Sequence, residues 1–350
     1  MLLDTTRGAR PTPSPSQLEE LHLLLNGYQV SQAISVVARL GVADLLADSP
    51  QACEELAQAT GTHAPSLCRV LRLLAGVGLF DEVGLRRFAL TRLGAGLRTD
   101  VPGSRRPWAL MLLDDAEWQA YGDLLHTVQT GETAFDHVHG IGRFEYLRRH
   151  PEAAAIFQEA MAANVEPAAP SLVDVYDFST FERVVDIGGG HGAILADVLL
   201  ACARTRGVLF DRPEVVAGAA PLLERAGVAA RCEIAGGDFF TAVPAGADAY
   251  ILRLVLHNWS DSQAVHVLRN CRAAIRESGR LLVIERAIAA NRREAISVLH
   301  TDLRMLVNQG GLERTDAEYR ALFVDAGFRL ASIVPLGGRS RFSVFEGMPA

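Results

Sequence analysis

Apolar residues recur every three or four positions through much of the first half of the chain. This spacing runs from Gln17 to about Leu46 and again through residues 105–180, and it predicts amphipathic helices with buried faces. Between them, residues 51–98 show helix, turn, helix and a short hairpin, the outline of a winged helix-turn-helix. Within the second helical stretch, residues 131–151 are expected to form a loop.

The pattern changes at Phe181, where short apolar strands begin to alternate with helices, one of which is predicted over residues 213–227, and the chain ends in a β hairpin. Strands with little polar alternation are typical of a parallel sheet covered on both faces. The fold class is therefore α/β, a doubly wound Rossmann-like domain preceded by a mainly helical winged-helix domain. Ligands of such sheets bind beyond the carboxyl ends of the strands, near the point where strand order reverses.

These patterns divide the chain into four segments. Residues 1–16 are rich in proline, serine and threonine and are expected to be a flexible tail. The winged-helix domain covers residues 17–104, a helical connection covers 105–180, and the α/β domain covers 181–350.

Charge weighs against a nucleic-acid partner for the winged helix. Arg69 and Arg72 on its second helix are compatible with DNA binding, but the chain has 34 basic and 41 acidic residues and a formal charge of −7. An acidic chain has no broad basic surface with which to release counterions from phosphates. Since that helix is also apolar over much of its circumference, dimerisation is the favoured role.

Composition excludes several other classes. The 350 residues are 49% hydrophobic and 21% charged, an ordinary globular balance. The sequence contains no lysine, so a P-loop, a pyridoxal Schiff base and a serine–lysine hydrolase site are all excluded. No signal peptide or membrane-length apolar run is visible, and we expect a cytoplasmic location without membrane association.

Cysteine and histidine spacing predicts no metal site. The five cysteines lie far apart without a C-x-x-C pair and are expected to be reduced thiols. His137 and His139 form an H-x-H pair, but without a third ligand at helical spacing this pattern is more typical of a loop surface.

The strongest local signal is a glycine turn after the first strand, VVDIGGGHG at residues 184–192. The pattern Gly188-x-Gly190-x-x-Ala193, with Asp211 further on, also satisfies a dinucleotide fingerprint. Asp186 argues against a nicotinamide cofactor, because a carboxylate beside the turn disfavours a pyrophosphate and suits a cationic ligand.

Two further strand ends carry candidate chemistry. The third strand ends in GDFF, where Asp238 and Phe239 suit an adenine held by its exocyclic amine and by stacking. The fourth strand ends in RLVLHNWSD, which brings His257 to the same crevice.

Six motifs in order carry a resemblance to a known family. DIGGG, FDRPEVV, GDFF, RLVLHNWSD, VIERAI and GGLERTDAEYRALFVDAGF, within a match over residues 20–348, resemble the S-adenosylmethionine-dependent small-molecule O-methyltransferases of plant phenylpropanoid and bacterial antibiotic pathways. The resemblance implies a metal-independent homodimer, joined through residues 17–104, that methylates an aromatic hydroxyl. Residues 105–180 would contribute to the substrate pocket and 181–350 would bind the cofactor.

The resemblance also implies roles for individual residues. His257 matches the general base, and Glu285 and Glu313 match the acids that orient it. The implied S-adenosylmethionine-binding residues are Asp186, Gly188, Gly189, Gly190, Asp211, Arg212, Asp238, Phe239 and Arg253, the last standing where lysine is common. The implied substrate-pocket residues are Phe157, Met161, Asn258, Met305 and Asn308. Asn258 stands where the family usually has aspartate, which removes a charge beside the base.

The motifs describe the cofactor better than the acceptor, so three alternatives stay open. The same scaffold could methylate nitrogen or carbon. A non-catalytic regulator would sense a small molecule and bind DNA in a salt-dependent way. A dehydrogenase would bind NAD instead of S-adenosylmethionine.

Overall fold

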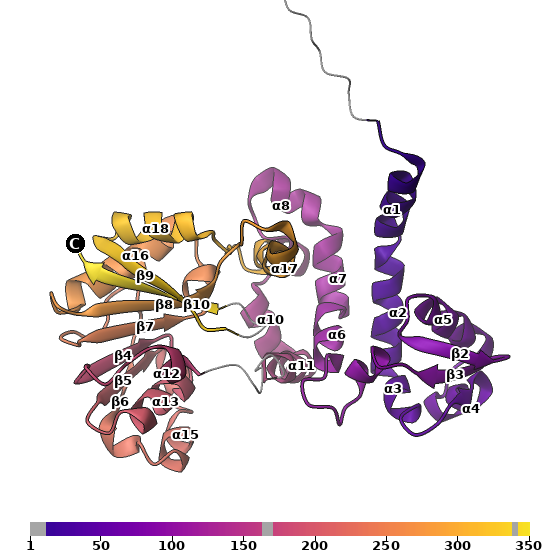
Figure 1. The fold of residues 1–350 in the computed structure, drawn as a ribbon, viewed down its shortest axis with the longest axis horizontal. Coiled ribbons are helices and arrows are strands. Elements are labelled where there is room, and N and C mark those ends of the chain that lie inside the picture. Colours follow the sequence, from indigo (N-terminus) through magenta and orange to yellow (C-terminus); the bar gives the residue numbers. More distant parts are fainter. Residues whose placement is uncertain (1–11, 163–170, 338–341) are drawn as a thin grey trace, which may run out of the picture. The chain divides into compact units, whose positions relative to one another are not determined.

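The structure is a computed structural model that describes residues 12–162, 171–337 and 342–350. It forms two compact units (Figure 1). Unit 1 comprises Met1–Trp118 and Pro151–Asn164, and unit 2 comprises Gln119–His150 and Val165–Ala350. The segment 105–180 is thus divided between the units. Most of the expected tail, residues 1–11, lies outside the described residues, and the first helix already begins at Pro15, where Ser14 caps it.

Unit 1 contains the winged helix. Its elements are α1 (Pro15–Leu25), α2 (Gly27–Arg39), α3 (Val42–Leu45), β1 (Gln51–Ala52), α4 (Cys53–Thr60), α5 (Ala64–Gly76), β2 (Phe80–Gly84), β3 (Arg87–Leu90), the 3-10 helix η1 (Gly94–Leu97), α6 (Arg106–Leu112) and α11 (Pro151–Ala162). The helix α7 (Asp115–Gly122) spans the boundary with unit 2. The predicted helix-turn-helix and hairpin are confirmed, with Gly61 at φ 66° ending α4. The two-residue strand β1, too short to show a period, was not predicted.

Unit 2 is built on a seven-stranded sheet. Its strands are β4 (Arg183–Ile187), β5 (Arg206–Asp211), β6 (Cys232–Gly236), β7 (Ala249–Arg253), β8 (Arg280–Arg286), β9 (Phe328–Pro335) and β10 (Phe342–Pro349), in the spatial order β6-β5-β4-β7-β8-β10-β9. The first five strands in this order are parallel, and β10 is antiparallel to both β8 and β9. Strand order reverses at β4, so the ligand crevice expected of this topology lies beyond its carboxyl end.

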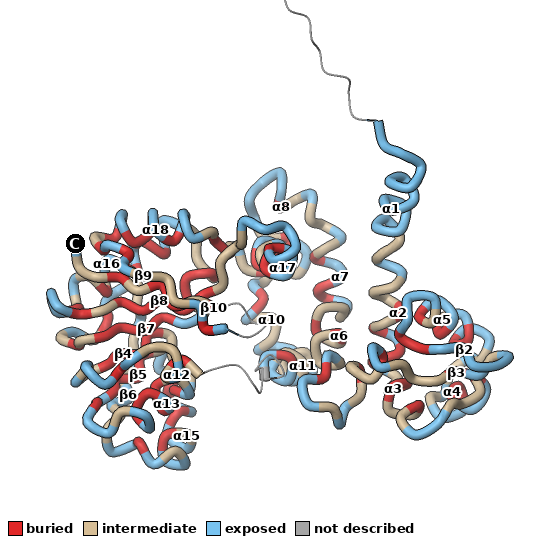
Figure 2. The backbone as a smooth tube through the Cα atoms, in the orientation of Figure 1, coloured by how far each residue is buried: buried red, intermediate tan, exposed pale blue. Residues whose placement is uncertain are grey.

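Helices cover both faces of this sheet. The helices of unit 2 are α8 (Leu124–Thr130), α9 (Ala134–His139), α10 (Arg143–Arg149), α12 (Leu172–Val175), α13 (Ala193–Ala201), α14 (Pro213–Val216), α15 (Ala220–Arg225), η2 (Ala229–Arg231), η3 (Leu256–Asn258), α16 (Asp261–Ala274), α17 (Arg292–Asn308) and α18 (Asp316–Asp325). Of these, α8, α9 and α17 pack against one another. Alternate residues along a strand enter opposite cores: Tyr250 of β7 packs with α16 and α18, and Ile251 packs with α12, α13 and α15. Figure 2 shows the resulting buried strands, and the predicted two-sided sheet is confirmed.

Two local predictions were wrong. Residues 131–151, predicted as a loop, contain α9 and α10, because Thr133 caps α9 and buried Phe135 packs against the edge of Tyr146. Residues 213–227, predicted as one helix, form two short helices, α14 and α15. No helix within the described ranges has the length and apolarity needed to cross a membrane.

The 3-10 helix η1 offers a matched test of packing in unit 1. A Cβ on Gly94 would lie 2.0 Å from the backbone oxygen of Leu79, whereas a Cβ on Gly96 would meet no atom within 4 Å. We expect Gly94→Ala to destabilise the protein by about 1–3 kcal/mol through overpacking and Gly96→Ala to leave stability nearly unchanged. Calorimetric unfolding midpoints of the two variants test this, and equal midpoints would contradict it.

Candidate active site

The turn after β4 depends on glycine at close contacts. Gly188 has φ 67°, and a Cβ there would lie 2.8 Å from Cγ2 of Val255. A Cβ on Gly189 would lie 2.5 Å from Oδ2 of Asp186. The turn is also tied to the neighbouring strand, because the Gly190 N–H donates to Oδ2 of Asp211 at 2.9 Å. The carboxyl ends of β4 and β5 are thereby joined through a hydrogen bond from backbone to side chain.

Asp186 lies buried beneath this turn. Asp186 is only 2% exposed, and its Oδ2 has no hydrogen-bond partner among the described residues. Burial raises the pKa of Asp186 to about 7, and the positive charge of Arg253 opposes that rise. Its carboxyl group is therefore much less acidic than an exposed aspartate.

A cavity of about 1000 Å³ opens at the carboxyl edge of the sheet in unit 2. Seven of the predicted cofactor and substrate residues line it: Gly188, Asp211, Arg212, Asp238, Phe239, Asn258 and Asn308. Other wall residues come from α9 and α10, namely Asp136, Arg143, Phe144 and Glu145. The cavity therefore lies where strand topology places ligands, and its volume is at the upper end of the usual range for small-molecule sites.

Aromatic rings form one wall of this cavity. The rings of Phe239 and Phe240 are 5.0 Å apart, and Phe240 meets Trp259 edge-on at 4.7 Å. Beside them, Asp238 is exposed, and its Oδ1 accepts a hydrogen bond from the Phe240 N–H at 2.9 Å. A flat ring with a polar edge could stack and hydrogen-bond on this wall.

Other predicted residues do not form the cavity wall in the part of the chain that the structure describes. Asp186, Gly189 and Gly190 are not among its lining residues, and Arg253 lies over the ring of Phe342 at 5.4 Å. Met305 is buried in α17. Phe157 and Met161 lie on α11 in unit 1, and their substrate role stays a prediction.

Two glutamates meet one imidazole beside Asn258, a residue of the cavity wall, although His257, Glu285 and Glu313 are not themselves among the described residues that line the cavity. His257 lies in η3 after β7, and its Nδ1 is 3.2 Å from Oε1 of Glu313 and 3.9 Å from Oε2 of Glu285. Glu285, near the end of β8, also accepts from the backbone N–H of Leu256 at 3.0 Å. All three side chains are buried, so the structure brings together the three residues predicted as base and orienting acids.

The electrostatics of this cluster raise the proton affinity of the imidazole. Burial opposes protonation of His257, but Glu285 and Glu313 more than offset it, so the pKa of His257 is raised above its usual value. Burial, reinforced by Glu313, raises the pKa of Glu285. The ligand atoms of the three residues lie within 4.8 Å of one another, a spacing that a metal ion also accepts. The guanidinium of Arg286 lies 3.4 Å from Glu313, and its positive charge disfavours a metal ion among these three residues.

The backbone around His257 is fixed by residues that the sequence did not reveal. Arg314 is fully buried and donates to the carbonyl oxygens of Leu256 and Trp259 at 3.0 and 2.8 Å. A Cβ on Gly311 would lie 2.2 Å from the carbonyl oxygen of His257. Both residues stand in the GGLERT motif beside Glu313, but an isolated arginine or glycine gives no sequence signal of such contacts.

Comparison with known proteins gives the family. A model described as an O-methyltransferase domain matches residues 121–329, and a model described as an O-methyltransferase dimerisation domain matches residues 22–100. The chain belongs to the O-methyltransferase family. This S-adenosylmethionine-dependent O-methyltransferase thus has the activity class and domain architecture that the six sequence motifs predicted.

Three relatives indicate the range of this family. The chain is 44% identical over 326 residues to phenazine O-methyltransferase PhzM of Lysobacter antibioticus, covering 93% of this chain and 94% of the relative. It is 37% identical to 8-amino-8-demethylriboflavin N,N-dimethyltransferase of Streptomyces davaonensis, covering 93% and 95%. A crystal structure of the O-methyltransferase NcsB1 from neocarzinostatin biosynthesis, with S-adenosylmethionine and 2-hydroxy-5-methyl naphthoic acid, is 34% identical with a TM-score of 0.77, covering 91% and 96%.

The paired carboxylates predict a measurable shift at His257. Replacing Glu313 by glutamine removes a negative charge that stabilises the imidazolium, so Glu313→Gln should lower the pKa of His257. An NMR pH titration of the histidine Cε1–H signals measures it, with the His257 signal assigned from a His257→Gln spectrum. The exposed Glu277, which pairs with Arg272, provides the control Glu277→Gln. An unchanged His257 titration in Glu313→Gln would show that the carboxylate does not stabilise the charged ring.

Proposed function

We propose that this enzyme transfers a methyl group from S-adenosylmethionine to a phenolic hydroxyl of a small aromatic specialised metabolite, with His257 as general base. The observation that carries the proposal is the buried His257–Glu285–Glu313 cluster beside the cavity. Since Nδ1 of His257 meets Glu313 at 3.2 Å, Nε2 is the nitrogen that accepts the substrate proton. The glutamates hold the tautomer and stabilise the imidazolium, as the third member of a catalytic triad does.

The cavity residues suit the proposed cofactor. Both oxygens of Asp211 accept one backbone N–H each, from Gly190 at 2.9 Å and Arg212 at 2.7 Å. Each carboxylate oxygen has a second lone pair, which leaves acceptors for two ribose hydroxyls. Asp238 and Phe239 would hold the adenine amine and ring, and Gly188 with its neighbours would hold the methionine part.

The remaining predicted cofactor residues act around this core. Asp186 and Gly189 shape the turn from below, Gly190 joins it to β5, and Arg212 and Arg253 add positive charge. S-adenosylmethionine, when bound, supplies an activated methyl group on a sulfonium, so the chain's residues chiefly align the acceptor and take its proton.

The base is needed because a phenol has a pKa of about 10 and is mostly protonated at neutral pH. A histidine whose pKa is raised by two carboxylates is a stronger proton acceptor than an ordinary one. General base catalysis typically contributes about 10²–10⁴ in rate. Good alignment of acceptor and methyl group contributes further through the entropy already lost on binding.

The relatives support an aromatic acceptor, and the dimerisation model supports a homodimer. One relative is named for phenazine and another was crystallised with a naphthoic acid. Phe157, Met161, Asn258, Met305 and Asn308 would contact the acceptor. The dimerisation model covers most of residues 17–104, through which two copies would associate.

Transfer to nitrogen is the second candidate, favoured by the N,N-dimethyltransferase relative. An aromatic amine is already neutral and needs its proton removed only after methylation. The position of the new methyl group in the product, determined by NMR, distinguishes the two acceptors.

Loss of the base should affect catalysis without affecting cofactor binding. We expect His257→Ala to lower kcat on a phenolic acceptor by about 10²–10⁴, with unchanged affinity for S-adenosylhomocysteine by calorimetry. His300→Ala, at an exposed position of α17, is the control and should retain wild-type kcat. Wild-type turnover by His257→Ala, on an acceptor known to be protonated at the assay pH, would exclude His257 as the base.

Cofactor class is tested by calorimetric titration of the wild-type protein with S-adenosylhomocysteine and NAD. We expect micromolar binding of the former and none of the latter. Asp211→Asn should weaken S-adenosylhomocysteine binding at least about tenfold, because a charged hydrogen-bond acceptor is lost, while Asp81→Asn on β2 should not. Binding of NAD, or equal affinities for both variants, would contradict the assignment.

A further inference from the structure

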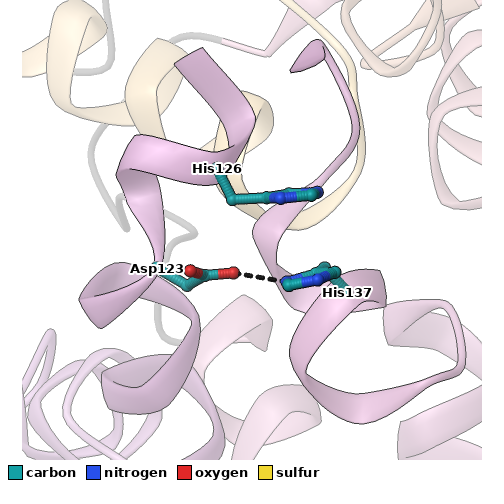
Figure 3. A group of neighbouring side chains, drawn as sticks. All are labelled: Asp123, His126 and His137. Carbon is teal, nitrogen blue, oxygen red and sulfur yellow. Dashed lines mark hydrogen bonds and ion pairs between the residues drawn. The ribbon is translucent and has the colours of Figure 1, made fainter. Parts of the chain in front are cut away.

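A second cluster of metal-ligating side chains lies on the α8–α9 hairpin of unit 2. Asp123 precedes α8, His126 lies within α8, and His137 lies on α9. Figure 3 shows the two imidazole rings lying one above the other, with the carboxylate of Asp123 beside His137. None of these residues belongs to the active site described above, and the sequence had paired His137 with His139 instead.

The three side chains are held close by several contacts. Nδ1 of His137 is 2.6 Å from Oδ2 of Asp123, and the rings of His126 and His137 are stacked at 3.7 Å with an angle of 9° between them. Nε2 of His126 is 3.2 Å from Oε2 of Glu132, in the turn between the helices. One ligand atom each from Asp123, His126 and His137 lies within 4.8 Å of the others.

This donor set is the one that borderline transition metals prefer. Two imidazole nitrogens and one carboxylate oxygen suit Zn²⁺ at about 2.0–2.2 Å per ligand, so tetrahedral ligands lie about 3.3–3.6 Å apart. Since the two rings are stacked, binding of the ion requires them to turn away from each other until the ligand atoms reach that spacing. Accessibility allows it, since the side chains of His137 and Asp123 are 51% and 34% exposed.

The backbone beneath the ligands is well fixed. Thr133 caps α9 and Gly140 ends it, while α8 and α9 pack against each other and against α17. Glu132, with a side chain that is 73% exposed, is close enough to His126 to supply a fourth ligand. The site therefore has three protein ligands, and its fourth position can be filled by Glu132 or by water.

We propose that Asp123, His126 and His137 form a binding site for a zinc-like divalent metal ion, which joins α8 to α9. The ion replaces the proton shared between His137 and Asp123 and lies between the carboxylates of Asp123 and Glu132. Asp136, the neighbour of His137, lines the active-site cavity, so the bound ion steadies that wall. This site takes no part in methyl transfer and is independent of the proposed function.

The test is calorimetric titration of the full-length, metal-free protein with ZnCl₂. We expect His126→Ala and His137→Ala each to weaken the binding of one zinc ion at least about tenfold, because loss of a residue that only supports a metal ligand already weakens metal binding by that much. The double variant should bind one zinc ion fewer than the wild type. His22→Ala, at an exposed position of α1, is the control and should bind as the wild type. Because stoichiometries are compared between variants, zinc at the cysteines or at His257 does not affect the result.

Two further measurements guard against misfolded variants. Asp123→Asn keeps the size of the side chain but removes the charge, and it should also weaken zinc binding. Zinc should raise the unfolding midpoint of the wild type and of His22→Ala, but not of the double variant, because only a ligand of the folded state stabilises it. Co²⁺ should give the visible absorption of a tetrahedral site in the wild type and in His22→Ala, but not in the double variant. Wild-type zinc stoichiometry and affinity in the double variant, or no zinc binding by the wild type, would overturn the proposal.

Discussion

The burial of two carboxylates against one imidazole constrains the carboxyl edge of the sheet in unit 2. Buried charges are stable only when paired and hydrogen-bonded, and here the pairing residues come from three separate segments: Glu285 on β8, His257 after β7, and Glu313 after α17. These segments must therefore meet at one place. Their meeting fixes one side of the cavity, while the glycine turn after β4 fixes the other.

The fold was predictable because its physical signals are local and repeated. Strands such as 249–253 are apolar at every position until the last, which indicates burial on both faces. The winged helix was predictable from the helical period and Gly61. The prediction of a loop at 131–151 was wrong because short helices such as α9 depend on a cap and on contacts with Tyr146. A helix of six residues is too short to show a helical period in the sequence.

For the site, sequence order gave the strand ends but not the contacts between them. Asp211, Asp238 and Asn258 could be assigned to one crevice because parallel strands end at one edge, and all three line the cavity. Two other contacts could not be predicted. The burial of Asp186 beneath Gly189 depends on which way the Asp186 side chain points, and the support of His257 by Arg314 joins residues far apart along the chain. The pairing of His137 with His126 and Asp123 likewise depends on how α8 and α9 pack.

Asn258 shows why a neutral residue follows the base in this chain. Its amide Nδ2 donates to the carbonyl oxygens of Leu254 and Val255 at 3.1 and 3.4 Å, and Leu254 has a positive φ of 55° that is unfavourable for a branched side chain. A carboxylate has no proton to donate to these carbonyls. It would also place a third negative charge beside Glu285 and Glu313, whose burial already makes two costly. The amide therefore holds the strained turn that orients His257 without adding charge, and the tuning of the base is left to the two glutamates.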